Sequence, residues 1–101
     1  MIKAVIKRPK EAATTHEFKN INEIYKLFKS LGYITFKNDI GMYFNDGGYY
    51  SGYTPNFTIN SHIVYGIVVF VGLDDEGKPK KLTYKQQEFV KEFLRNNSYC
   101  R

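Results

Sequence analysis

The sequence lacks most of the residues from which catalytic and metal sites are built. Its 101 residues include one cysteine and two histidines, with no CxxC and no Cys/His spacing. The lone cysteine, Cys100, cannot form an internal disulfide, and a structural zinc site needs four Cys or His ligands. There is also no Gly-x-Ser-x-Gly elbow and no phosphate-loop or dinucleotide glycine pattern. These absences favour a binding protein without cofactors over an enzyme.

Long apolar runs are missing as well. The segment Met1 to Lys7 lacks the apolar stretch of a signal peptide. The longest apolar stretch, Ile63 to Leu73, is far shorter than the roughly 20 residues that span a bilayer. We therefore expect a cytoplasmic protein. The length favours a single domain over residues 1–101.

Basic residues are absent from the middle of the chain. Between Asn38 and Gly77, forty residues contain no Lys or Arg and five acidic residues, a net charge of −5. The flanks hold all 15 basic residues and the other five acidic ones, a net charge of +10. One interpretation is that the lysines only solvate exposed faces of helices and a sheet edge. The other is that the segregated charge marks interaction surfaces.

The first half of the chain predicts strands around one helix. Residues 2–7 alternate in polarity and predict a half-buried strand, and residues 14–19 predict a weaker one. Apolar residues then repeat at helical spacing over 21–31, with Asn20 as the N-cap and Gly32 as the left-handed residue after the helix. Residues 33–37 predict a third strand.

The second half predicts a hairpin, a central strand and a capped helix. Asn45-Asp46-Gly47-Gly48 predicts a turn between strands at 42–45 and 49–53, and residues 52–60 a loop, since Pro55 disfavours ladder pairing. The continuous apolar run 63–73 predicts one strand covered on both faces. Thr83 predicts the cap of the last helix. The fold class is therefore α+β, a mostly antiparallel sheet of about five to six strands with two helices packed on it.

Residues 43–57 are unusually aromatic. Six of these 15 residues are Tyr or Phe, and most of the others are Gly, Ser, Asn or Asp. Such a composition is typical of binding loops, in which Tyr supplies contact area at low entropic cost. The alternative is that the rings seal one end of the core. The candidate partner-binding residues are Tyr43, Asp46, Tyr49, Tyr50, Tyr53, Asn56 and Phe57.

Nucleic acid is the second class of candidate partner, because the sequence pI is about 9.3. Single-stranded nucleic acid needs stacking rings and cations together. The aromatic stretch contains no cation, so a protein partner fits it better unless folding brings the basic flanks alongside. The candidate nucleic-acid contacts are Lys7, Arg8, Lys10, Lys78, Lys80, Lys81 and Lys85.

Three segments together resemble the domain of unknown function 3846 family of phages and mobile genetic elements. They are the strand Ile2-Lys3-Ala4-Val5-Ile6-Lys7-Arg8-Pro9; Asn45-Asp46-Gly47-Gly48 with the later Pro55-Asn56; and Tyr65 to Gly72 with the Asp74–Gly77 turn, Leu82-Thr83 and Gln86. The chain departs from that family in its Tyr-rich stretch and in Phe57, where a basic residue is common.

The resemblance implies a phage or mobile-element accessory protein in the cytoplasm of a bacterial host cell. Proteins of this origin and size are often inhibitors of host defence, including anti-CRISPR proteins. We therefore expect a non-enzymatic inhibitor that binds a host protein or nucleoprotein complex. The alternative is a small nucleic-acid-binding module of a mobile element. The identity of the partner and the oligomeric state stay open.

Overall fold

The computed structural model describes residues 1–47 and 52–99. Eight strands and two helices are built in the order β1 (Ile2–Lys7), β2 (Thr14–Phe18), α1 (Ile21–Tyr25), β3 (Leu31–Lys37), β4 (Ile40–Asn45), β5 (Pro55–Ile59), β6 (His62–Tyr65), β7 (Val68–Leu73), β8 (Pro79–Lys80) and α2 (Tyr84–Asn97).

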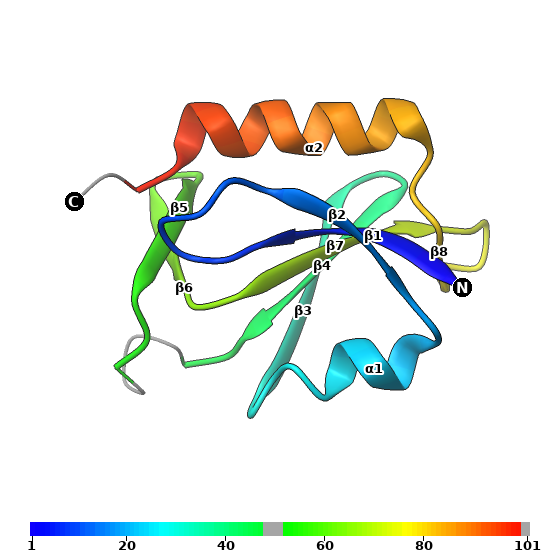
Figure 1. Cartoon of the computed structure of the whole chain (residues 1–101), viewed down its shortest axis with the longest axis horizontal. Helices are drawn as coiled ribbons and strands as arrows, with labels where there is room; N and C mark the ends of the chain where they lie inside the picture. Colours follow the sequence, from blue (N-terminus) through cyan, green and yellow to red (C-terminus); the bar gives the residue numbers. More distant parts are fainter. Residues whose placement is uncertain (48–51, 100–101) are drawn as a thin grey trace.

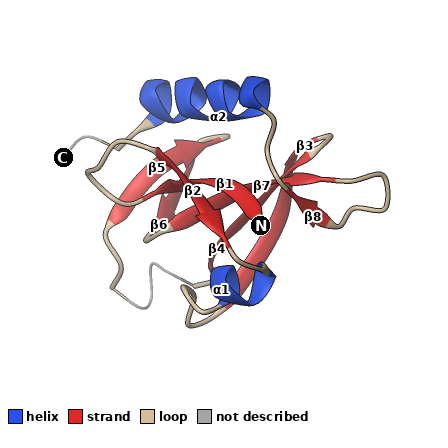
Figure 2. Ribbon diagram, turned by 45° about the vertical axis from the view of Figure 1, so that its right-hand side comes forward, coloured by secondary structure: helices blue, strands red, loops and turns tan. Residues whose placement is uncertain are grey.

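The predicted α+β class is confirmed. Five strands form a sheet in the order β2-β1-β7-β4-β3, and β8 pairs with β7, which makes it six-stranded. Every pairing is antiparallel, and β5 and β6 form a separate two-stranded sheet. Helix α2 lies across one side of the sheet and α1 lies on the other (Figures 1 and 2).

The core is divided by the sheet into two layers. On the α1 side, Ala4 and Ile6 of β1 pack with Ile24 of the helix. On the α2 side, Val5 packs with Val90 and with Phe57 of β5. Strand β1 is therefore covered on both faces. The prediction of a half-buried strand was wrong, because the lysine that suggested a wet face is itself buried at the end of this strand.

Helix α1 is shorter than the predicted 21–31. Its N-cap is as predicted, since the Asn20 side chain accepts a hydrogen bond from the Glu23 backbone N–H. The helix ends at Tyr25 because the following chain bonds to the end of β4. The Lys29 backbone N–H donates to the buried Asn45 side chain, and the Ser30 carbonyl accepts from the Asp46 N–H. These tertiary hydrogen bonds draw the chain into β3.

The predicted hairpin after β4 is described only in part. Gly47, in its turn, has a φ of 70°. Strand β4 pairs with β3 on one side and with β7 on the other. Residues 48–51 lie outside the described residues, and residues 52 and 53 belong to no strand.

The apolar run 63–73 forms two strands rather than one. Gly66, at a φ of 80°, separates β6 from β7. Strand β7 is central in the main sheet, whereas β6 pairs with β5 in the small sheet. Pro55 opens β5, a position that a proline can take because the first residue of a strand need not donate to the ladder. The prediction of a loop over 52–60 was therefore wrong for residues 55–59.

Helix α2 starts as the sequence predicts. The Thr83 hydroxyl accepts from the Gln86 N–H at 3.1 Å, and the Gln86 side chain accepts from the Thr83 N–H at 2.8 Å, which completes the capping box. Val90 and Leu94 are buried against the sheet, but Phe89 is 46% exposed. One large aromatic side chain of the helix thus faces solvent.

Candidate functional site

Three of the predicted partner-binding residues are core residues. Tyr43, Asn56 and Phe57 are buried, Phe57 completely. Phe57 packs against Phe70 and Phe93 between the sheet and α2. Their burial excludes direct contact with a partner in this structure. These three residues therefore belong to the core, as the alternative interpretation of the aromatic stretch predicts, and not to a binding loop.

Asn56 and Lys7 form one buried hydrogen-bond network. The Lys7 ammonium donates to the Asn56 side-chain oxygen at 2.8 Å and to the Arg8 carbonyl at 2.9 Å. The Asn56 amide donates to the Lys7 carbonyl at 2.8 Å and to the Gly66 carbonyl at 2.6 Å. The network joins β1, β5 and the bend between β6 and β7. Lys7 was predicted as a nucleic-acid contact, but its burial makes it a structural residue.

Tyr43 lies at the centre of a group of three tyrosines. Its ring centroid is 4.9 Å from that of Tyr33 and 5.8 Å from that of Tyr25. Burial raises the pKa of Tyr43 well above its ordinary value, and the neighbouring Tyr25 adds to the rise. Tyr25 and Tyr33 are both partly exposed. Exposed tyrosines therefore occur on α1 and β3, outside the stretch in which they were predicted.

The remaining predicted partner-binding residues are scattered. Asp46 is exposed beside Gly47, and Tyr53 is half-buried next to Gly66. Tyr49 and Tyr50 lie outside the described residues. The described part of the aromatic stretch therefore does not form one continuous surface.

The predicted basic contacts are exposed, except for Lys7, but they are separated. Arg8 and Lys10 follow β1 at the end of the molecule where β5 lies, whereas Lys78 and Lys80 flank the start of β8 at the opposite end (Figure 1). Lys81 and Lys85 are near the start of α2. Folding therefore places these residues in two groups.

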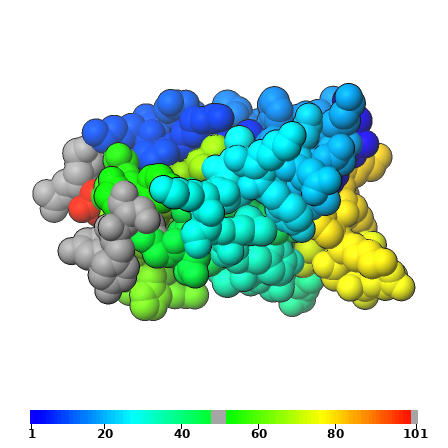
Figure 3. Space-filling view, turned by 90° about the horizontal axis from the view of Figure 1, so that it is seen from below, coloured from blue at the N-terminus to red at the C-terminus, as the bar shows by residue number. Residues whose placement is uncertain are grey.

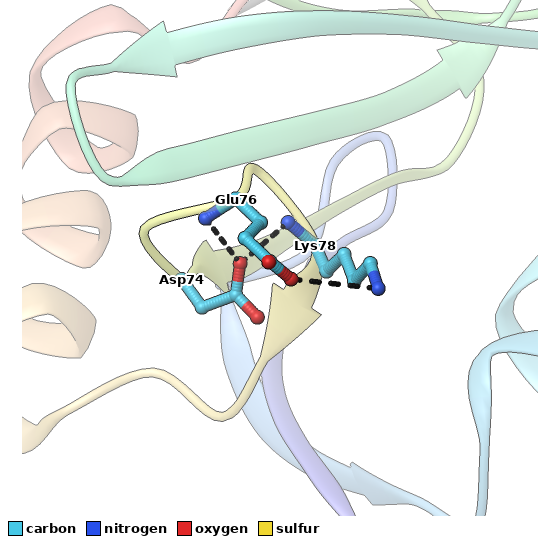
Figure 4. Close-up of polar contacts among 3 residues, drawn as sticks. All are labelled: Asp74, Glu76 and Lys78. Atoms are coloured by element: carbon cyan, nitrogen blue, oxygen red, sulfur yellow. Dashed lines mark hydrogen bonds and ion pairs between the residues drawn. The ribbon is translucent and has the colours of Figure 1, made fainter.

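The acidic run after β7 is a turn, as predicted. One carboxylate oxygen of Asp74 accepts from the Lys78 and Glu76 backbone N–H groups, each at 2.9 Å (Figure 4). These hydrogen bonds, that from Lys78 first, lower the pKa of Asp74 below its ordinary value. Glu76 pairs with the Lys78 ammonium at 3.5 Å.

The most distinctive surface lies at the β3 edge of the main sheet. Strand β3 is last in the strand order, so the side away from β4 has no neighbouring strand among the described residues. Leu31, Tyr33 and Ile34 are 43%, 42% and 40% exposed. Seen from the α1 side, this strand is on the surface next to the helix (Figure 3). Large apolar side chains on an open strand edge are uncommon, because they promote pairing with another chain.

A groove of about 420 Å³ adjoins this edge. We call it the β3–β6 groove. Its floor comes from Ile34, Met42 and Phe44, and its opposite wall from Ile59, Ile63 and Val64. Asn45, Asn60 and His62 contribute polar atoms, and no lysine or arginine of residues 1–47 and 52–99 lines it.

Two aromatic rings shape this end of the sheet by covering glycines. A Cβ atom on Gly32 would lie 2.6 Å from the Phe44 ring, and one on Gly41 would lie 2.6 Å from the Tyr33 hydroxyl. Each ring thus occupies the space that a side chain on the neighbouring strand would fill. Gly32 was predicted to follow the end of a helix. It lies instead in β3, where the absence of a side chain leaves room for the Phe44 ring that lines the groove.

Sequence reasoning missed the residues that define this surface. Leu31 fits the helical spacing of residues 21–31, and Ile63 fits a buried central strand. The sequence signal for this surface is the uncharged, mostly apolar stretch between Lys29 and Lys37. A buried strand would show the same pattern, so the stretch alone does not indicate an exposed edge.

No group of three or more His, Cys, Asp or Glu side chains in residues 1–47 and 52–99 could hold a metal ion. Over the same residues, no helix is long and apolar enough to cross a membrane. Comparisons with family models, curated proteins and solved structures found no match. The resemblance to the domain of unknown function 3846 family therefore stays a prediction.

Proposed function

We propose that this chain is a non-catalytic binding protein that binds a protein partner at the β3 edge and the β3–β6 groove. The observation that carries the proposal is the exposure of Leu31, Tyr33 and Ile34 on a strand with an open side. Exposed large apolar side chains on both faces of an open strand edge are a mark of protein interaction sites.

The chemistry of the groove favours a protein over a nucleic acid. Its lining is mostly apolar and, within the part of the chain that the structure describes, includes no lysine or arginine to neutralise a phosphate. Side chains such as Ile63 and Ile34 offer no hydrogen bonds, so the matching partner side chains are apolar. The expected role as an inhibitor of host defence, of the anti-CRISPR type, would require this kind of stoichiometric binding to a host protein or nucleoprotein.

The test is a selection of binding peptides with matched variants of the two edge strands. We expect a display library of random peptides to yield sequences that bind the wild-type chain. Ile34→Lys should weaken their binding at least about tenfold, since it places a charge at the apolar centre of the site. Thr14→Lys adds the same charge to the exposed β2 and should bind like the wild type.

Two outcomes contradict the proposal. One is a selected peptide that binds Ile34→Lys and Thr14→Lys equally well, with both variants folded by thermal melting. The other is a wild-type chain that is dimeric by light scattering and becomes monomeric in Ile34→Lys, because a second copy would then occupy the site.

Nucleic-acid binding is the second candidate, and one observation favours it. Near the start of α2, Lys37 and Lys85 line a hollow beside the exposed Phe89, with the Lys37 ammonium 5.7 Å from the ring centroid. A ring with adjacent cations can bind a single-stranded nucleic acid. Titration with single-stranded DNA at low and high salt tests it: binding that weakens with salt and is lost in the double variant Lys37→Glu, Lys85→Glu would support it. No binding at low salt would exclude it.

A further inference from the structure

We infer that the partner contributes an extended strand, with apolar residues in its centre and acidic residues at both ends, that pairs with β3 and enlarges the main sheet. The inference rests on the proposed function and names the form and chemistry of the segment bound. Three features of the described residues carry it: the backbone at the edge, the two apolar faces of the strand, and the charges at its ends.

The backbone of β3 is suited to strand addition. From Leu31 to Thr35 its register with β4 is regular, and the irregularity lies between Thr35 and Lys37. Proteins commonly protect an edge with lysine, proline or a bulge within the strand. Here no charged residue and no proline occurs from Leu31 to Phe36. An added strand could therefore pair along five consecutive residues.

Both faces of the edge offer apolar contacts to an added strand. Successive side chains of a strand point to opposite faces, so an added strand would present every second side chain to each face. On one face these side chains would meet Ile34 and the β3–β6 groove. On the other they would meet Tyr33, which packs on Tyr43. The centre of the partner strand should therefore be apolar at consecutive positions.

The charges at the two ends of β3 select the ends of the partner. Exposed Lys26 and Lys29 precede the strand. Lys26 lines a hollow together with the Glu23 carboxylate, and Asp46 is bonded through its N–H to Ser30. Within the described residues the ion pair found within 4 Å is Lys78–Glu76, so neither lysine has a carboxylate at that distance there.

At the other end, Lys37 and Lys85 line one hollow together with Asp39. An exposed lysine thus lies close to each end of the uncharged stretch from Leu31 to Phe36, Lys29 before it and Lys37 after it. Acidic residues at both ends of a bound strand would meet these two lysines.

The same charges disfavour a second copy of this chain as the added strand. Antiparallel pairing of two β3 strands would bring the Lys29 end of one copy to the Lys37 end of the other. Like charges would then face each other at both ends of the pairing. A partner strand with acidic ends avoids this repulsion.

The experiment uses designed peptides and the full chain. The probe is the acetylated and amidated peptide Asp-Asp-Val-Tyr-Val-Tyr-Val-Asp-Asp. One control replaces its four aspartates with lysines, and a second carries N-methyl groups on alternate central residues, which removes backbone donors and keeps the side chains. Binding is measured by calorimetry, and hydrogen exchange of the β3 and β2 amides is followed with and without peptide.

We expect each control peptide to bind at least about tenfold more weakly than the probe. The probe should slow exchange in β3 and leave β2 unchanged. Ile34→Lys should lose binding and Thr14→Lys should retain it.

The outcomes separate this inference from the proposed function. Equal binding of the N-methylated and unmethylated peptides, equal binding of the acidic and basic peptides, or no binding of the probe at millimolar concentration overturns the strand addition. The proposed function still stands in these cases if peptides selected from the library bind the wild type and not Ile34→Lys. If those peptides also fail to distinguish Ile34→Lys from Thr14→Lys, both are wrong.

Discussion

The two edges of the main sheet differ in chemistry although both are single outer strands. Strand β2 exposes Thr14, Thr15, His16 and Glu17, and the Thr15 hydroxyl donates to the Gln87 side chain of α2 at 3.1 Å. Strand β3 exposes Leu31, Tyr33 and Ile34 as well as Thr35 and Lys37. The fold therefore accommodates a polar edge at one side, which shows that an apolar edge is not a requirement of the architecture. This difference is the reason to assign binding to β3.

The largest effect is expected where the wall of the β3–β6 groove is joined to the sheet. Asn56→Ala would remove one acceptor of the Lys7 ammonium and the amide that donates to the Lys7 and Gly66 carbonyls. Loss of such a network should lower the free energy of unfolding by about 2–4 kcal/mol. Denaturant unfolding measures it. A loss below about 0.5 kcal/mol would mean that the network does not hold the β5–β6 hairpin to β1.

A smaller effect is expected from filling the space beneath Tyr33. Gly41→Ala places a methyl group against the Tyr33 ring and near Leu73. The exposed ring can move aside, so we expect a loss of about 1 kcal/mol and a displaced Tyr33. Chemical shifts of the tyrosine ring report the movement. Chemical-shift changes confined to residues 40–42 would show that the ring does not rest on Gly41. The chemical shifts of β2, at the other edge of the sheet, should be unchanged in either case.

Alkaline pH should destabilise the fold through the buried Tyr43 of β4. The pKa of Tyr43 is raised by burial, whereas the unfolded chain ionises near the ordinary value of about 10. The unfolded state therefore loses its proton first, and the stability that neutral Tyr43 contributes is present below pH 10 and falls as the pH rises above it. Unfolding followed from pH 8 to 11 tests this, and Tyr43→Phe should flatten the decline. An equal decline in both proteins would assign it to other groups.

The smallest effect on stability is expected from exchanging the chemistry of the two edges. Ile34→Thr and Thr14→Ile alter exposed positions, so each should change the free energy of unfolding by less than about 0.5 kcal/mol. Their effects on association should be opposite: Ile34→Thr should reduce peptide binding, and Thr14→Ile should increase self-association in light scattering. Equal binding by both variants would remove the distinction between the edges.

Local patterns in the sequence were enough for the fold class, the bounds of the first strand though not its burial, and the cap of α2. These features depend on neighbouring residues, as Thr83 and Gln86 show by bonding to each other. The end of α1 was missed because it depends on a hydrogen bond from the Lys29 N–H to the side chain of Asn45, which is sixteen residues away in the sequence. The division of residues 63–73 was missed because the two strands on either side of Gly66 are equally apolar.

The candidate site was harder to predict than the fold, since being at an edge is a property of the topology. The sequence shows that Tyr33 and Ile34 are apolar, but only the pairing of β4 with β3 and β7 places them beside an open edge. Asn56 and Lys7 are polar residues that become buried by bonding to each other across 49 positions. The composition of residues 43–57 predicted one exposed binding surface. The described residues of this stretch do not form such a surface, because several of them are buried.

The pairing of β1 with β7 has a consequence for the order in which the chain can fold. Val5 pairs with Phe70, so the two central strands come from segments about 65 residues apart. At ordinary rates of synthesis this interval takes on the order of several seconds. During that time β3 and β4 can form a hairpin with apolar residues open on both outer sides. The apolar edge at which we propose binding is then exposed before the sheet exists, and exposed strand edges are prone to pair with other chains.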